Sequence, residues 1–72
     1  MKAPRWNASC PDGHGMMWEA SGSTAYEAAL GAVLWARPST PQNAEAFDGT
    51  GRSVVFNARR EGGRFVVQEI TG

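Results

Sequence analysis

The sequence has very little of what metal sites and secreted scaffolds are built from. Its 72 residues include one cysteine, Cys10, and one histidine, His14. A single cysteine rules out a disulfide within the chain, which excludes the small secreted scaffolds held together by several disulfides. A structural zinc ion needs four ligands, and the segment from Cys10 to His14 supplies only half of such a set. We therefore expect no metal and no cofactor.

Residues suited to catalysis are equally sparse. Cys10 and His14 lack a third group that would orient them as nucleophile and base. The glycines of Gly49-Thr50-Gly51 and Gly62-Gly63 do not have the spacing of a phosphate-binding loop. The carboxylates are scattered singly, as on a solvated surface. These absences predict a protein that is not an enzyme and has no catalytic residues.

Long apolar runs and an excess of charge of one sign are also missing. No apolar stretch approaches the roughly 18 residues of a membrane span, and Met1–Trp6 lacks the apolar core of a secretion signal. We expect a cytoplasmic protein with no membrane partner. Seven basic residues balance seven acidic ones, whereas nucleic-acid-binding domains usually have a pI above about 9. The overall charge therefore argues against a polyanion as the main partner.

The length predicts one domain over residues 1–72, with a flexible N-terminal few residues. A domain of about 60 residues buries only about 60% of the surface that its unfolded chain exposes. Such a core rarely supplies more than about 3–5 kcal/mol. Little material is left for a deep, walled active site.

The residue pattern predicts an α+β fold in which one helix packs on a small antiparallel sheet of about four strands, in the order β-β-α-β-β. Thr24 and Glu27 form a capping-box pattern at the start of the helix, and Pro38 ends it. Turn residues separate the strand candidates from one another. The expected elements are strands at 5–10 and 16–20, a helix at 25–37, a short helical turn at 41–47, and strands at 52–60 and 64–71.

The last two strands are expected to form a hairpin around the turn at 61–63. A loop of two or four residues that pairs Ala58 with Phe65 and Phe56 with Val67 collects the apolar side chains on one face, whereas a three-residue loop does not. We therefore expect that register.

The two sides of the helix differ in an unusual way. A helical projection predicts a core stripe of Tyr26, Ala29, Leu30, Val33 and Arg37. The opposite side carries almost no charge and consists of Ala28, Gly31, Ala32 and Trp35. Small residues allow close approach of another backbone, and tryptophan is enriched at binding hot spots. Either Trp35 packs under the segment 38–47 of the same chain, or this side binds a partner.

The second candidate site is a set of arginines on the last hairpin: Arg52, Arg59, Arg60 and Arg64. Such a cluster could bind phosphate, RNA or an acidic protein groove, and Phe65 could add a stacking ring beside Arg64. Alternatively, the arginines form a solvated hairpin tip that discourages pairing at the sheet edge.

In size, neutral charge and predicted architecture, the whole chain resembles the small phage-encoded inhibitors of host machinery, of the anti-CRISPR or RNA polymerase inhibitor type. The resemblance implies a compact protein that occupies and blocks a surface of a larger enzyme, and it carries over no functional residue. We therefore predict a protein–protein interaction module that inhibits or regulates a larger bacterial enzyme, such as RNA polymerase or a CRISPR effector. Its predicted contact residues are Trp35, Ala28, Gly31, Ala32, Arg37, Arg59, Arg60 and Arg64. The alternative is a nucleic-acid-binding module using Arg52, Arg59, Arg60, Arg64 and Phe65.

Overall fold

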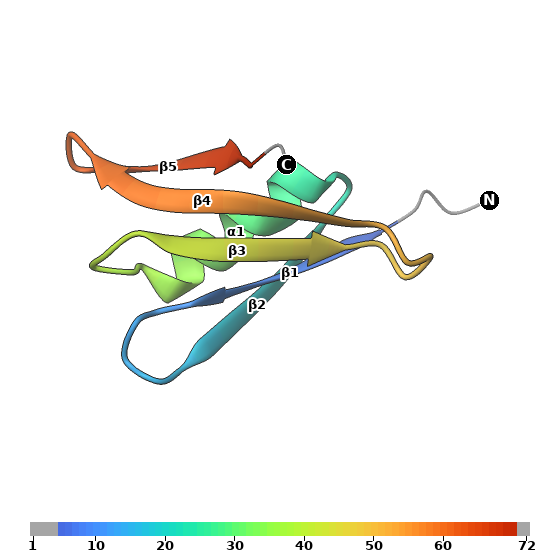
Figure 1. Ribbon diagram of the computed structural model, residues 1–72, viewed down its shortest axis with the longest axis horizontal. Coiled ribbons are helices and arrows are strands. Elements are labelled where there is room, and N and C mark those ends of the chain that lie inside the picture. The colour runs from blue at the N-terminus through green and yellow to red at the C-terminus, as the bar shows by residue number, and fades with distance from the viewer. Residues whose placement is uncertain (1–4, 71–72) are drawn as a thin grey trace.

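The computed structural model describes residues 5–70 and shows one helix lying against one face of a five-stranded sheet (Figure 1). The flexibility expected for the first few residues concerns positions that lie outside the described residues. In chain order the elements are β1 (Trp6–Pro11), β2 (Met17–Gly22), α1 (Ala25–Ala36), β3 (Gln42–Phe47), β4 (Ser53–Glu61) and β5 (Arg64–Glu69).

The sheet has the strand order β2-β1-β3-β4-β5, and all neighbouring strands are antiparallel. The fold is therefore α+β, with one helix on a small antiparallel sheet. The expected count of about four strands is wrong, since residues 5–70 form five, in the order β-β-α-β-β-β. α1 packs mainly on β1 and β2, so β4 and β5 extend past its cover, and the opposite face of the sheet carries no helix.

The additional strand is β3, where a short helical turn was expected. Ala44 and Ala46 are completely buried, while Asn43, Glu45 and Phe47 between and beside them are exposed. This alternation is the period of a strand, although alanine and glutamate individually favour helices. Pairing with β4 along all of β3, and with β1 at residues 45–47, overrides that preference.

Both ends of α1 follow from the local sequence. The Thr24 hydroxyl accepts a hydrogen bond from the Glu27 backbone N–H at 3.1 Å, and the Glu27 carboxylate accepts one from the Ser23 N–H at 3.2 Å. The expected capping box is confirmed. At the other end, Arg37 adopts a left-handed conformation (φ 48°), and its N–H donates to the Val33 carbonyl. No helix among residues 5–70 is long and apolar enough to cross a membrane.

The core is built largely from alanine. Ala28, Ala32 and Ala36 of α1 face the sheet, where the buried residues are Ala8, Cys10, Ala44, Ala46, Phe56, Ala58 and Val67. Small side chains on both layers allow the helix backbone to approach the sheet closely. The expected core stripe is therefore only partly right.

Within that stripe, Ala29 and Val33 are buried as expected. Tyr26 is about half exposed at 49%, Leu30 is partly buried, and Arg37 is exposed at the helix end. The buried face of the helix is rotated toward the alanines, so that Ala28, Ala32 and Ala36 are buried together with Ala29 and Val33.

The β4–β5 hairpin has a two-residue turn, Gly62-Gly63, in which both residues have positive φ. Its register differs from the expected one by two residues, since Ala58 pairs with Val67 and Phe56 with Glu69. A shift of two residues preserves the face of every side chain. The apolar residues therefore still face the helix as predicted.

Candidate functional site

The largest exposed apolar side chains of the helix lie near its C-terminal end. Trp35 is 65% exposed and Leu34 is 54% exposed. The segment 38–47 does not cover Trp35, because residues 42–47 are incorporated into the sheet as β3. Of the two alternatives for Trp35, the structure excludes burial under its own chain. Arg37, also exposed, caps the helix two residues after Trp35, and we call Leu34, Trp35 and Arg37 the helix-end surface.

The small residues expected to accompany Trp35 on an open face do not do so. Ala28 and Ala32 are completely buried against the sheet, so their expected place on an open surface is wrong. Gly31 is partly buried, and a Cβ atom at this position would lie 3.0 Å from the Cβ of Ala20 on β2. The small residues thus allow α1 to approach its own sheet, and Leu34, which was not predicted, takes their place on the exposed side.

The other two tryptophans are half-buried and packed against the core. The Trp18 indole N–H donates to the Asp12 carboxylate at 3.1 Å, and the Arg52 guanidinium lies 5.7 Å from the centre of a Trp6 ring. Trp35 is therefore the tryptophan free to make new contacts.

Several other exposed groups share one end of the molecule with the helix-end surface. The C-terminal end of α1 lies at the same end as the tips of the β1–β2 and β4–β5 hairpins (Figure 1). Met16, which is 58% exposed, belongs to the first tip. Arg60 and Arg64 flank the second tip, and both are exposed. This end thus combines exposed apolar side chains with several arginines.

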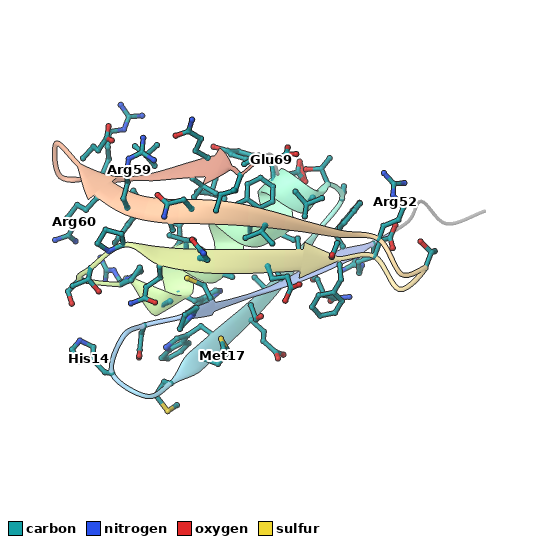
Figure 2. All side chains as sticks on the ribbon, viewed as in Figure 1. His14, Met17, Arg52, Arg59, Arg60 and Glu69 are labelled. Atoms are coloured by element: carbon teal, nitrogen blue, oxygen red, sulfur yellow. The ribbon has the colours of Figure 1, made fainter. Side chains whose placement is uncertain are left out.

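The four arginines of the last hairpin do not form a single patch, so the expected cluster is wrong. Arg52 precedes β4, while Arg59 and Arg60 lie near its other end, on opposite faces of the sheet (Figure 2). Arg60 stands eight positions after Arg52 along extended backbone, a span of about 26 Å. A single phosphate group could not contact both.

Three of these arginines are engaged within the chain. Arg52 lies 3.9 Å from the Asp48 carboxylate and stands over a Trp6 ring. Arg59 donates to the carboxylate of Glu61 and, at 3.1 Å, to the side-chain oxygen of Gln68. The Arg60 guanidinium lies 5.0 Å from the centre of the Phe65 ring. The cation beside Phe65 is therefore Arg60 and not Arg64 as expected. Phe65 is also partly buried, which leaves little of its ring for stacking on a base.

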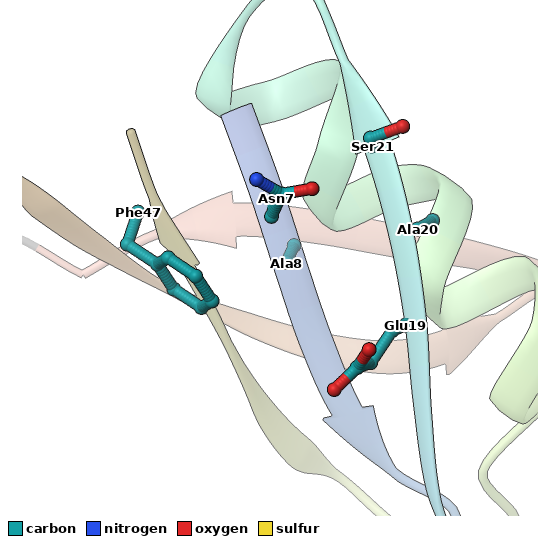
Figure 3. A pocket seen from close by; sticks show the side chains of 6 residues that line it. All are labelled: Asn7, Ala8, Glu19, Ala20, Ser21 and Phe47. Atoms are coloured by element: carbon teal, nitrogen blue, oxygen red, sulfur yellow. The ribbon is translucent and has the colours of Figure 1, made fainter. Parts of the chain in front are cut away.

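The helix-free face of the sheet is polar, a feature that sequence analysis did not single out. Asn43 on β3 lies opposite Asn57 on β4, and Asn57 in turn lies opposite Gln68 on β5. A hollow of about 360 Å³ lies on this face, where the Phe47 ring stands near Asn7 and Glu19 (Figure 3). The polar alternation in each strand would have predicted this face once the register was known.

The β1–β2 turn separates the only cysteine from the only histidine. Cys10 is completely buried, and burial, with a further contribution from the nearby Asp12 carboxylate, raises the pKa of its thiol. His14 is exposed at the tip of the turn. Its backbone N–H donates to Asp12 at 2.7 Å, and this bond is the main reason why the pKa of Asp12 lies below its usual value. Within residues 5–70, no three histidine, cysteine or carboxylate side chains are grouped so that they could hold a metal ion.

No protein family, curated protein or solved structure matches this chain.

Proposed function

We propose that this chain is a protein-binding module that regulates or inhibits a larger bacterial enzyme by occupying part of its surface. The single observation that carries the proposal is the exposure of Trp35, together with its neighbour Leu34, on the outer side of α1. Tryptophan is the residue type most enriched at the centres of protein interfaces. An exposed tryptophan gains a large buried apolar area when a partner covers it.

The surroundings of Trp35 indicate the kind of partner. Arg37 caps the helix two residues after it, and the β4–β5 tip, near which Arg60 and Arg64 lie in sequence, is at the same end of the molecule as the C-terminal end of α1. An apolar centre with charged groups around it has the usual anatomy of a protein interface. The complementary surface would have an apolar pocket for Trp35 with carboxylates around it, because charges of opposite sign assist association and fix orientation.

The arginines give less support to the nucleic-acid alternative. Arg52 lies at the other end of β4, and Arg59 is paired with Glu61. A chain with balanced charge and separated arginines offers no continuous basic track for a phosphate backbone. Contact with a protein through Trp35 is therefore the function that the geometry favours.

The test compares the wild-type chain with a Trp35→Ala variant. Each is immobilised and exposed to bacterial extract, and the protein retained by the wild type in stoichiometric amount is identified and purified. We expect Trp35→Ala to weaken binding of that protein at least about 30-fold, which corresponds to a hot-spot contribution of about 2 kcal/mol. Calorimetric or surface-based titration measures the change.

The matched control is Phe47→Ala, which removes another exposed aromatic ring, 45% exposed, from the helix-free face of the sheet. This control should leave affinity unchanged, and circular dichroism should show the fold intact in both variants. Equal binding by wild type and Trp35→Ala would contradict the proposal. So would loss of the fold on removing Trp35, because the side chain would then be structural.

A further inference from the structure

One edge of the sheet is available for pairing with another strand. β5 (Arg64–Glu69) lies at the end of the strand order, and within residues 5–70 its only neighbouring strand is β4 (Figure 1). The Ile70 N–H donates to the Val55 carbonyl at 2.8 Å. In an antiparallel pair, alternate residues bond to the neighbour, so Gln68, Val66 and Arg64 bond to β4. The backbone groups of Phe65, Val67 and Glu69 therefore point outward from the edge.

The centre of this edge has little of the usual protection against pairing. Natural edge strands are protected by charged side chains, proline or a bulge. β5 has no proline, its register with β4 is continuous from Glu69 to Arg64, and its two charged residues stand at its ends. Its centre is Phe65-Val66-Val67. The opposite edge, β2, has the exposed Glu19 near its centre, where pairing with a second copy would bring like charges together.

The outward groups of β5 restrict how two copies could pair. Antiparallel pairing about a two-fold axis at Val67 places the two Val67 residues opposite each other, and Phe65 opposite Glu69 of the second copy. Strands in a sheet lie about 4.8 Å apart. Both chains contribute the same strand, β5, to the interface, as a two-fold interface requires.

The charges across this pairing are complementary. Arg60 pairs with Phe65 across β4 and β5, and its guanidinium lies 5.0 Å from the centre of the Phe65 ring. Glu69 of the second copy would stand on the other side of the same ring, on the same face of the sheet. The described residues place neither Arg60 nor Glu69 in an ion pair within the chain. In the dimer, Arg60 of each chain lies near Glu69 of the other, so this pair of opposite charges occurs twice.

The surface beside the edge is incompletely filled. A groove of about 500 Å³ runs along β5, and its lining includes Tyr26, Phe65 and Val67 together with the charged Glu61 and Arg64. Tyr26 is 49% exposed, because α1 covers mainly the opposite half of the sheet. The two-fold axis at Val67 brings the grooves of two chains together, so each would be closed by the other.

We propose that this chain forms a homodimer by antiparallel pairing of β5 with β5 of a second copy, which joins the two sheets into one of ten strands. Helix-end residues such as Trp35 take no part in this pairing. The dimer and the proposed binding function can therefore succeed or fail separately.

Sedimentation equilibrium of the full chain over a range of concentrations tests the dimer. We expect a mass twice the 7.7 kDa of one chain at the higher concentrations. Glu69→Arg and Arg60→Glu should each raise the dimer dissociation constant about tenfold or more, because each places like charges on both sides of Phe65. The double variant restores opposite charges and should recover most of the affinity. Glu45→Arg, an equal charge change on the helix-free face, should have no effect.

Amide hydrogen exchange on the wild-type chain gives a second measurement that needs no variant. In a monomer, the amides of Val66 and Gln68 are protected, while those of Phe65, Val67 and Glu69 exchange freely. In the dimer both sets are protected, and protection of the outward set should increase with protein concentration. A chain that remains monomeric at about 1 mM would overturn the proposal. So would a dimer in which the outward amides still exchange freely, because another surface would then hold it.

Discussion

Single residues of the β1–β2 turn show how one side chain can organise a loop. The Asp12 carboxylate accepts hydrogen bonds from the backbone N–H groups of His14 and Met16 and from the indole of Trp18. A carboxylate in this position satisfies donors that the turn itself leaves unpaired. The same contacts lower its pKa below the usual 3.8, the His14 bond contributing most. The ionised form of Asp12 is therefore the form that the folded turn favours.

This leads to a prediction about acid stability. The pKa of Asp12 is lower in the folded than in the unfolded chain. Its contribution to the free energy of unfolding is therefore fully present above the pKa of the unfolded chain, and it is lost as pH falls through the pKa of the folded chain. We expect Asp12→Asn to lower the free energy of unfolding at neutral pH and to reduce its decline between about pH 5 and pH 2. Urea unfolding at a series of pH values measures both.

Asp48 provides the comparison for this measurement. Its pKa is also lowered, chiefly by the Thr50 backbone N–H. The Asp12→Asn variant should keep the part of the acid dependence that is due to Asp48, and the double variant with Asp48→Asn should lose that part as well. An acid dependence identical in wild type and Asp12→Asn would show that the Asp12 contacts do not favour the folded state.

At the scale of elements, α1 begins where its sequence predicts, whereas β3 is a strand where its sequence predicts a helical turn. The contacts among Thr24, Glu27 and Ser23 lie within five residues, so the local sequence is enough to specify the start of the helix. The backbone partners of β3 are distant in sequence, since Ala46 pairs with Ala8 and with Val54. Only the assembled sheet supplies those partners.

The cap of α1 gives a prediction for this element. Replacing Thr24 with alanine leaves the Glu27 N–H without its acceptor, and we expect a loss of about 1 kcal/mol in the free energy of unfolding. Urea unfolding should show the lower midpoint with an unchanged slope. Thr40→Ala is the matched control. Among the described residues, the Thr40 hydroxyl accepts one hydrogen bond, from the side-chain amide of Gln42 at the protein surface. The prediction is wrong if Thr24→Ala and Thr40→Ala lower the free energy of unfolding by the same amount.

At the scale of the whole molecule, the alanine-rich core makes the few large buried side chains important. Phe56 lies at the centre of β4, is 3% exposed, and meets the ring of Tyr26 edge-on at 6.2 Å between centroids. Alanines on both layers hold the helix close to the sheet but bury little apolar area each. Much of the hydrophobic stabilisation therefore depends on Phe56 and Val33.

We accordingly predict that Phe56→Ala unfolds the chain. Removal of a buried phenylalanine costs about 3–5 kcal/mol, which is comparable to the entire stability that a core of this size supplies. Circular dichroism at 25 °C should show loss of structure for Phe56→Ala, whereas Phe56→Leu should remain folded with reduced stability. All variants are compared at one protein concentration, because dimer formation would add to stability. The prediction would be contradicted if Phe56→Ala unfolds cooperatively and its free energy of unfolding is less than about 1 kcal/mol below that of the wild type.

The sequence by itself determined the features that depend on near neighbours. The α+β class, the helix with its cap, the two hairpins and the alternation that directs Phe56, Ala58, Phe65 and Val67 to one face were all predicted correctly. Each depends on turn residues, capping contacts or side-chain period, which operate over a few residues.

The tertiary structure alone decided the rest. It made residues 42–47 a strand, because that segment fills the space between two hairpins. It turned the small residues of α1 inward, because the sheet beneath is also lined with alanine, and so left Leu34 beside Trp35 on the outside. It separated Arg52 from Arg60 along one extended strand. These outcomes depend on contacts between segments distant in sequence, so local patterns did not decide them.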